Sequence, residues 1–153
     1  MGQERLYEFA KFGSLVEPQK LAAATLYNGV AATVATGYGL DTMGYDGITI
    51  FLNTGTFSGD GTLDVSVYAG ATDDSTACSA ISGAVFTQVT TANDQTLYKG
   101  YVKVHAQARY LFVKTVKGGT GDAPAAIEYG MDRGQKHPEL VNTSLAFDVD
   151  GSV

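Results

Sequence analysis

Apolar side chains recur at every second position through the middle of the chain, and this period of two constrains the fold more than any other feature. It extends from about Gly47 to Met131, and Ile48, Ile50 and Leu52 form its clearest run. Successive side chains of a β-strand point to opposite faces of a sheet, so such a run predicts a strand with one buried face. We therefore expect the chain to fold mainly as β-sheet.

Further runs of the same kind follow along the chain. They are rich in β-branched and aromatic residues, and Gly, Asn, Asp and Ser separate them. The predicted strands are Leu63 to Val67, Val85 to Val89, Thr96 to Val104, Arg109 to Val116 and Pro124 to Tyr129. Short strands spaced by roughly 10 to 15 residues, without helical stretches between them, are typical of an antiparallel β-sandwich or jelly roll.

Two glycine-rich segments are expected to be hairpin turns. Asp60-Gly61 is a strong hairpin signal between two predicted strands. Residues 117–121, Lys-Gly-Gly-Thr-Gly, resemble a phosphate loop, but they lack the Gly-Lys-Ser/Thr ending and precede a predicted strand rather than a helix. We interpret them as a second hairpin connection.

The two ends of the chain differ from its middle. Leu6, Phe9 and Ala10 are spaced as one face of a helix within a charged segment, which is either a contact arm or a frayed terminus with a short surface helix. The expected organisation is an N-terminal arm over residues 1–20, a β-sandwich domain over 21–138 and an extended, weakly acidic C-terminal extension over 139–153.

The composition excludes several classes of protein. The 153 residues fit one domain, and 10 basic against 16 acidic residues give a net charge of −6. That sign argues against phosphate backbones as partners, so we expect no nucleic-acid binding. Cys78 is the one cysteine, which rules out an internal disulfide, and no Cys/His cluster has zinc-site spacing.

No membrane partner is expected either. Leu21 to Leu40 is uncharged and as long as a membrane span, but Ala, Thr, Gly and Asn dominate it, so we interpret it as β-structure. The first eight residues include two acidic residues and no apolar run, which predicts that a secretory signal is absent.

The charges are segregated along the sequence. No Lys or Arg lies between Lys20 and Lys99, and no acidic residue lies between Lys99 and Lys117. On the strand predicted there, alternation places Lys99, Tyr101, Lys103 and His105 on one face. This strip could bind an acidic loop of a neighbouring copy or another acidic protein; the alternative is a solvated sheet face balanced by aspartates of the same molecule.

Catalytic and metal-binding patterns are sparse, so we predict no enzymatic activity and no cofactor. The two histidines, His105 and His137, have no nucleophile motif near them, and Asp73 and Asp74 would raise the thiol pKa of Cys78. The other aspartates lie almost entirely in turns, where the side chain bonds to nearby amides. The alternative to this turn chemistry is that some aspartates bind calcium. The candidate ligands are Asp60 with Asp64, or Asp148 with Asp150.

The order of several segments resembles that of small structural proteins of tailed-phage heads, the head decoration or capsid cement proteins. The similar segments are Gly39 to Ile50 (GLDTMGYDGITI), Asp60 to Val67, Phe86 to Val89, Asn93 to Gly100 and Ala108 to Lys114, within roughly Leu21 to Pro138. The resemblance implies a β-sandwich or jelly roll, a homotrimer, and the major capsid protein as partner. It also implies a place on the outer capsid surface of the virion, after synthesis in the host cytoplasm.

The expected contact residues lie in the arm and in the base-only region, which is the segment from Lys99 to Lys117 that contains no acidic residue. They are Arg5, Phe9 and Lys11 in the arm, and Lys99, Tyr101, Lys103, His105, Arg109 and Lys114 in the base-only region. Two alternatives stay open. One is another phage structural component, such as a tail or neck protein; the other is a carbohydrate-binding module, which the nine tyrosines favour and the lack of tryptophan disfavours.

Overall fold

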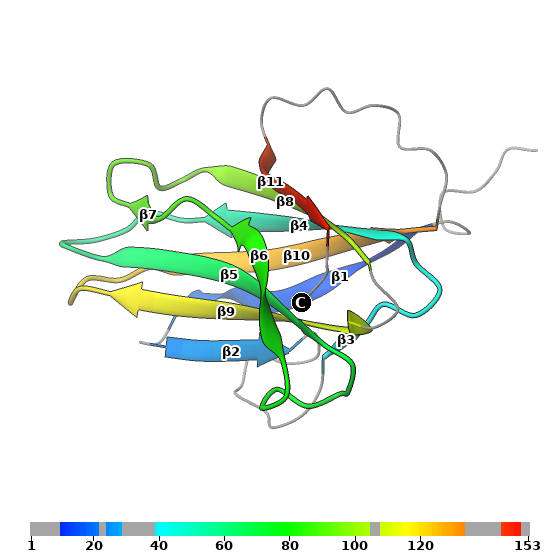
Figure 1. Ribbon diagram of the computed structural model, residues 1–153. Helices are drawn as coiled ribbons and strands as arrows, with labels where there is room; N and C mark the ends of the chain where they lie inside the picture. The colour runs from blue at the N-terminus through cyan, green and yellow to red at the C-terminus, as the bar shows by residue number, and fades with distance from the viewer. Residues whose placement is uncertain (1–9, 22–23, 29–38, 105–107, 134–144, 151–153) are drawn as a thin grey trace, which may run out of the picture.

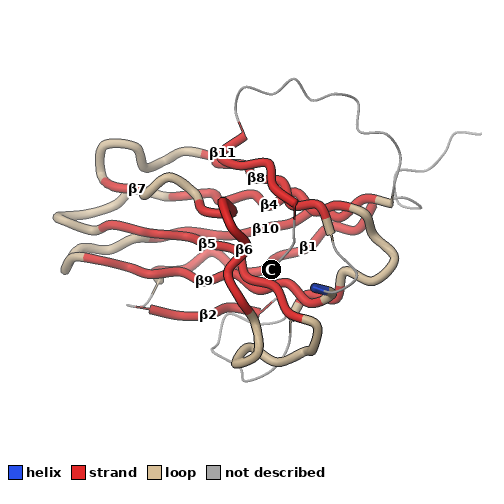
Figure 2. Tube along the Cα trace, in the orientation of Figure 1, coloured by secondary structure: helices blue, strands red, loops and turns tan. Residues whose placement is uncertain are grey.

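The chain folds into two β-sheets that pack face to face (Figures 1 and 2). The computed structural model describes residues 10–21, 24–28, 39–104, 108–133 and 145–150, and these contain eleven strands and no α-helix. The predicted β-sandwich is confirmed. No helix within the described ranges is long and apolar enough to cross a membrane.

The first sheet, sheet A, has the strand order β1-β10-β4-β8-β11. Its strands are β1 (Ala10–Lys20), β10 (Pro124–Asp132), β4 (Gly47–Thr54), β8 (Leu97–Lys103) and β11 (Leu145–Asp150). All neighbours pair antiparallel except β11, which lies parallel to β8. Strands from both ends of the sequence thus flank a centre made from its middle.

The second sheet, sheet B, has the order β2-β9-β5-β6, with two short strands attached. Its strands are β2 (Ala24–Asn28), β9 (Tyr110–Gly118), β5 (Thr62–Gly70) and β6 (Ser79–Val85), with β3 (Leu40–Asp41) on β9 and β7 (Val89–Thr90) on β5. Its pairings are antiparallel.

The core fills the space between the two sheets, and the period of two in the sequence builds it. On β4, Ile48, Ile50 and Leu52 are fully buried, whereas Thr49 and Phe51 stay partly exposed on the other face. The same alternation on β5 buries the side chains of Leu63, Val65 and Val67. Each such side chain contributes about 1.5–3 kcal/mol through removal of apolar surface from water.

The N-terminal boundary of the sheet lies inside the range expected to form the arm. Ala10, predicted to lie on a helical face, begins strand β1 instead, and residues 10–20 pair with β10. Alternation is obscured there because the register shifts between Ser14 and Val16, so that Leu15 and Val16, adjacent in sequence, are both buried. Leu6, Phe9 and the rest of residues 1–9 lie outside the described residues.

Part of the expected C-terminal extension is also a strand. Leu145–Asp150 forms β11, which lies beside β8 at the edge of sheet A (Figure 1). Residues 134–144 and 151–153 lie outside the described residues. Sheet A therefore includes segments on both sides of the predicted 21–138 domain.

Neither predicted hairpin turn is a hairpin. The loop containing Asp60-Gly61 joins β4 of sheet A to β5 of sheet B, and the loop containing Gly118-Gly119 joins β9 of sheet B to β10 of sheet A. Turn chemistry specifies a reversal of the chain but not the sheet to which the next strand belongs. Both loops are corners of the sandwich, at the same end.

The predicted strand Val85 to Val89 is also wrong as a continuous element. Strand β6 ends at Val85, and β7 begins at Val89. Between them the side chain of Phe86 is buried, and its backbone N–H donates to the carbonyl of Val65 at 2.9 Å. Phe86, the aromatic residue that suggested a continuous strand, instead packs into the core from the segment between β6 and β7.

Candidate interaction surface

The basic strip lies on the outer face of sheet A, the face turned away from the core. Lys99, Tyr101 and Lys103 alternate along β8 with the buried Val102, as the sequence predicts. Lys103 is exposed, and the other two side chains are half-buried. The strip thus exists as a surface feature of three described residues; His105 lies outside the described residues.

Aromatic rings on this face cover glycines of the neighbouring strand. The hydroxyl end of the Tyr101 ring lies where a side chain at Gly47 would stand, and the Phe12 ring takes the same place over Gly130. An aromatic ring laid over a glycine restores side-chain packing that the glycine lacks. This arrangement holds two rings flat against the outer face, although Phe12 keeps 60% of its surface exposed.

Two acidic residues that the sequence analysis did not single out share this outer face. Glu128 and Asp132 lie on β10, and pairing places Glu128 opposite Phe51 and Asp132 opposite Gly47 on β4. Residues four apart on a strand point to the same side. The predicted strand Pro124 to Tyr129 includes Glu128. Extending its alternation by three residues would have placed Asp132 on the same face.

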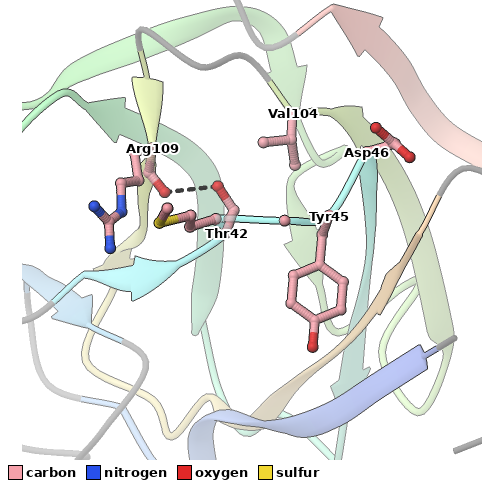
Figure 3. A pocket seen from close by; sticks show the side chains of 7 residues that line it. Thr42, Tyr45, Asp46, Val104 and Arg109 are labelled. Atoms are coloured by element: carbon pink, nitrogen blue, oxygen red, sulfur yellow. Dashed lines mark hydrogen bonds between the residues drawn. The ribbon is translucent and has the colours of Figure 1, made fainter. Parts of the chain in front are cut away.

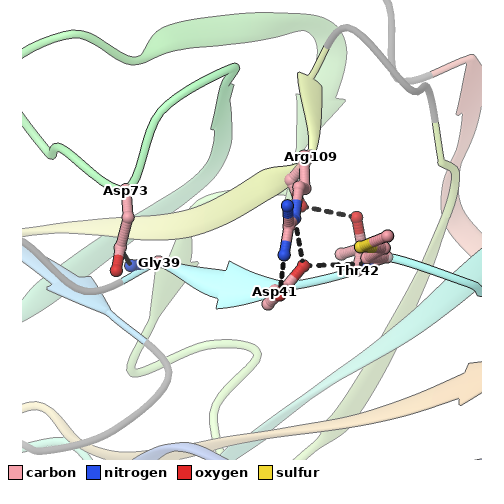
Figure 4. Close-up of polar contacts among 6 residues, drawn as sticks. Gly39, Asp41, Thr42, Asp73 and Arg109 are labelled. Atoms are coloured by element: carbon pink, nitrogen blue, oxygen red, sulfur yellow. Dashed lines mark hydrogen bonds and ion pairs between the residues drawn. The ribbon is translucent and has the colours of Figure 1, made fainter.

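Arg109 does not join the strip, because it is held by an acidic residue of its own chain (Figure 4). Its Nε and Nη2 atoms donate to the two carboxylate oxygens of Asp41 at 2.7 and 2.5 Å. Its backbone carbonyl accepts a 2.6 Å hydrogen bond from the hydroxyl of Thr42. This fork-to-fork geometry fixes the β3 strand to the start of β9.

A pocket of about 460 Å³ lies beside this ion pair (Figure 3). Its lining consists of Thr42, Met43, Gly44, Tyr45, Asp46, Val104 and Arg109. The guanidinium of Arg133 stacks on Tyr45, 5.0 Å from the ring centroid. Among the described residues of the lining there is no cysteine or histidine, and the Thr42 hydroxyl donates to a carbonyl, so the lining residues named here offer no activated nucleophile.

The two remaining described contact residues lie elsewhere. Lys114 is on β9 of sheet B, where its ammonium lies 5.6 Å from the ring centroid of Tyr68. Lys11 is exposed on β1, directly opposite Met131. The structure therefore brings Lys99, Tyr101 and Lys103 together on one face and places Lys114 on the other sheet. Arg5, Phe9 and His105 lie outside the described residues.

Most aspartates between Lys20 and Lys99, the stretch that contains no Lys or Arg, bind groups of their own chain. The carboxylate of Asp60 accepts hydrogen bonds from the backbone and hydroxyl of Thr120 at 2.8 and 2.9 Å and from the N–H of Gly121 at 3.1 Å. Asp94 accepts from the N–H of Phe57 at 2.6 Å. These bonds are the turn chemistry that the sequence predicts.

The described residues contain no group of three or more His, Cys, Asp or Glu side chains arranged to hold a metal ion. Cys78 is half-buried, and its thiol donates to the carbonyl of Ser75 at 3.1 Å. Partial burial raises the pKa of the Cys78 thiol, and the negative charge of Asp74 raises it further. This direction agrees with the sequence analysis and disfavours thiolate chemistry.

The Asp41–Arg109 pair predicts a loss of stability in acid. The hydrogen bonds from Arg109, aided by the N–H of Met43, hold the pKa of Asp41 below its ordinary value of 3.8. A carboxylate whose pKa is lowered on folding stabilises the fold above about pH 4, and this contribution is lost as the pH falls through the folded pKa. The melting temperature should therefore fall as the pH drops below about 4.

Asp41→Asn should remove part of that acid dependence. At neutral pH it should cost up to about 1 kcal/mol, since the pair is half exposed to solvent. Asp46→Asn is the matched control, because the Asp46 carboxylate forms no ion pair with any residue in the described part of the chain. Thermal melts from pH 6 to pH 2 test this; identical pH profiles for wild type and Asp41→Asn would contradict it.

Comparison with known proteins gives a structural match of low similarity. A chain in a solved structure of infectious bursal disease virus, strain Gx, aligns with 83% of this chain at 12% identity and a TM-score of 0.31. The aligned part spans 32% of that chain. No protein-family model and no curated protein matches this sequence. Similarity at this level carries no argument about function, which has to come from the residues themselves.

Proposed function

We propose that this chain is a non-enzymatic structural protein of a phage virion, which binds the outer surface of the capsid as a trimer and stabilises the assembled shell. The observation that carries the proposal is where the segments resembling head decoration proteins lie. They include the first halves of β4 and β8 in sheet A, and β3 with the first parts of β5 and β9 in sheet B. The resemblance thus covers strands from both layers of one sandwich rather than an isolated motif.

The physics of shell stabilisation fits a protein of this kind. A protein that binds the expanded shell and not its precursor shifts the equilibrium toward the expanded state by mass action. Such a role needs contact surface and no reacting group. The outer face of sheet A supplies charged and aromatic side chains on a rigid support.

Co-sedimentation with empty phage capsids tests the proposal. The protein should pellet with expanded shells and not with unexpanded procapsids, which are the matched control. At about 100 times the Kd it should stabilise the shell by about 2.7 kcal/mol per site and raise the shell melting temperature.

Two results would contradict the proposal. One is binding to neither particle, or equal binding to both, with an unchanged shell melting temperature. The other is assembly of the protein alone into rings or tubes in electron micrographs, which would favour a tail or neck component.

A further inference from the structure

The pocket beside the Asp41–Arg109 pair lies between two crossings of the chain from one sheet to the other (Figure 3). Residues 42–46 cross from β3 of sheet B to β4 of sheet A, and Val104 and Arg109 flank the crossing from β8 to β9. The N–H of Thr42 donates to the carbonyl of Arg109 at 3.0 Å. The N–H of Val104 donates to the carbonyl of Asp46 at 2.8 Å. Backbone hydrogen bonds therefore fix the two crossings to each other around the pocket.

Apolar surface that continues from the core is open in this pocket. Tyr45 and Val104 pack against the core cluster but are only partly buried, and Met43 keeps 68% of its surface exposed. The volume of about 460 Å³ falls within the range of about 300–1,000 Å³ that ligand pockets occupy. An apolar group that filled this pocket would leave water for a site that the fold has already shaped.

The chain that precedes β1 starts from the same end of the sandwich. Ala10 lies opposite Asp132, which in turn lies opposite Gly47, the residue after the pocket lining. Two strand intervals, about 10 Å in all, therefore separate Ala10 from Gly47. The pKa of Asp41, lowered mainly by the hydrogen bonds from Arg109, is lowered further by the positive charge of Lys11. The first residues of β1 thus lie close to the pocket and its ion pair.

We propose that this pocket binds the N-terminal arm of the same chain, with Leu6 in the cavity and Phe9 against Tyr45. Residues 1–9, which lie outside the described residues, precede Ala10 directly. The four residue steps from Leu6 to Ala10 span up to about 13–14 Å, which is more than the two strand intervals between Ala10 and Gly47. The occupant is therefore an extended peptide that presents apolar side chains.

Charge at the edge of the pocket also suits the arm. The guanidinium of Arg133 stacks on the Tyr45 ring and forms no ion pair within the described residues. Arg133 follows Asp132, and Glu8 stands two residues before the Ala10 that lies opposite Asp132. A Glu8 carboxylate bonded to Arg133 would hold the guanidinium over the ring.

The tether assigns the pocket to the arm of the same chain rather than to that of a second copy. A segment joined to the protein beside its own site acts at an effective concentration on the order of millimolar. An arm from another molecule competes with it only at comparable protein concentrations. The inference uses neither a trimer nor a shell, so it does not rest on the proposed function.

Disulfide trapping in the full chain tests the proposal. Cys78, the one cysteine, is replaced by serine, and cysteines are introduced by Leu6→Cys and Met43→Cys. With oxidised glutathione as the oxidant, this pair should form a disulfide about tenfold faster than Leu6→Cys with Lys103→Cys, because binding raises the effective concentration of the arm thiol at the pocket. Lys103 is the matched control, since it is exposed at the same end of the sandwich but lies on the outer face of sheet A.

Charge exchange at Arg133 gives an independent measurement. Arg133→Glu should slow the trapping between residues 6 and 43 several-fold, and Glu8→Arg in the same chain should restore the rate. Lys99→Glu is the matched control, because it reverses a charge on β8 away from the pocket, and it should leave the rate unchanged. Far-UV circular dichroism checks that each variant keeps its β-sheet.

Three results would overturn the proposal. Equal trapping rates at residues 43 and 103 would show that the arm does not favour the pocket. A disulfide that joins two chains on a non-reducing gel would assign the pocket to the arm of a second copy. A rate that Glu8→Arg does not restore would show that the arm is not held beside Arg133. None of these outcomes bears on shell binding, which the capsid experiment measures separately.

Discussion

Replacing Phe86 with alanine is expected to lower the free energy of unfolding by about 3–5 kcal/mol. This is a large share of the about 5–15 kcal/mol that stabilises a typical domain. The side chain is 2% exposed and lies between β6 and β7. The substitution loses the free energy gained by burying an aromatic ring away from water. It also leaves a cavity that the close-packed neighbours fill only in part.

Urea unfolding followed by circular dichroism measures this loss. Phe12→Ala is the matched control, because it removes the same atoms from a side chain that is 60% exposed. It should cost about 1 kcal/mol or less, and the measurement should be made at low protein concentration, where self-association does not contribute. Similar losses for the two variants would contradict the burial of Phe86.

Gly119→Ala is expected to cost about 3 kcal/mol, from two causes that a second glycine separates. Gly119 has φ +69°, a left-handed conformation that costs a residue with a side chain about 1–2 kcal/mol. An added Cβ would also overlap the backbone carbonyl of Asp60 in the adjacent corner loop. Relieving that overlap requires the loop to shift, at about 1–3 kcal/mol.

Gly44 isolates the conformational part of this effect. It has φ +83°, but an added Cβ there meets no atom within 4 Å. Gly44→Ala should therefore cost only about 1–2 kcal/mol. Denaturant unfolding of both variants gives the difference. If Gly119→Ala costs no more than Gly44→Ala, the two corner loops do not pack as closely as described.

Local pattern predicted the strands of this protein better than it predicted their partners. The alternation of Ile48, Ile50 and Leu52 was enough to identify β4 and its buried face. The side of β8 on which Lys99 and Lys103 lie followed from the same rule. These predictions succeed because they depend only on the two-residue repeat of a strand.

Predictions that required knowledge of distant contacts failed. Asp60-Gly61 marks a turn, but its place at a corner between sheets depends on Thr120, which is 60 residues away. The partner of Arg109 is Asp41, 68 residues earlier. The sequence pattern did not predict strand β1, because register shifts place Leu15 and Val16 together in the core and break the alternation.

The pairing of β1 with β10 has a consequence for biosynthesis. Roughly a hundred residues separate the two strands, and a ribosome needs on the order of 5–20 s to make them. During that time β1 carries Leu15 and Val16 without the strand that buries them. Charged residues next to an apolar strand act as gatekeepers against aggregation, and Lys11, Glu17 and Lys20 occupy such positions. The charges of β1 therefore lie where they would oppose aggregation of the nascent chain until its partner strand emerges.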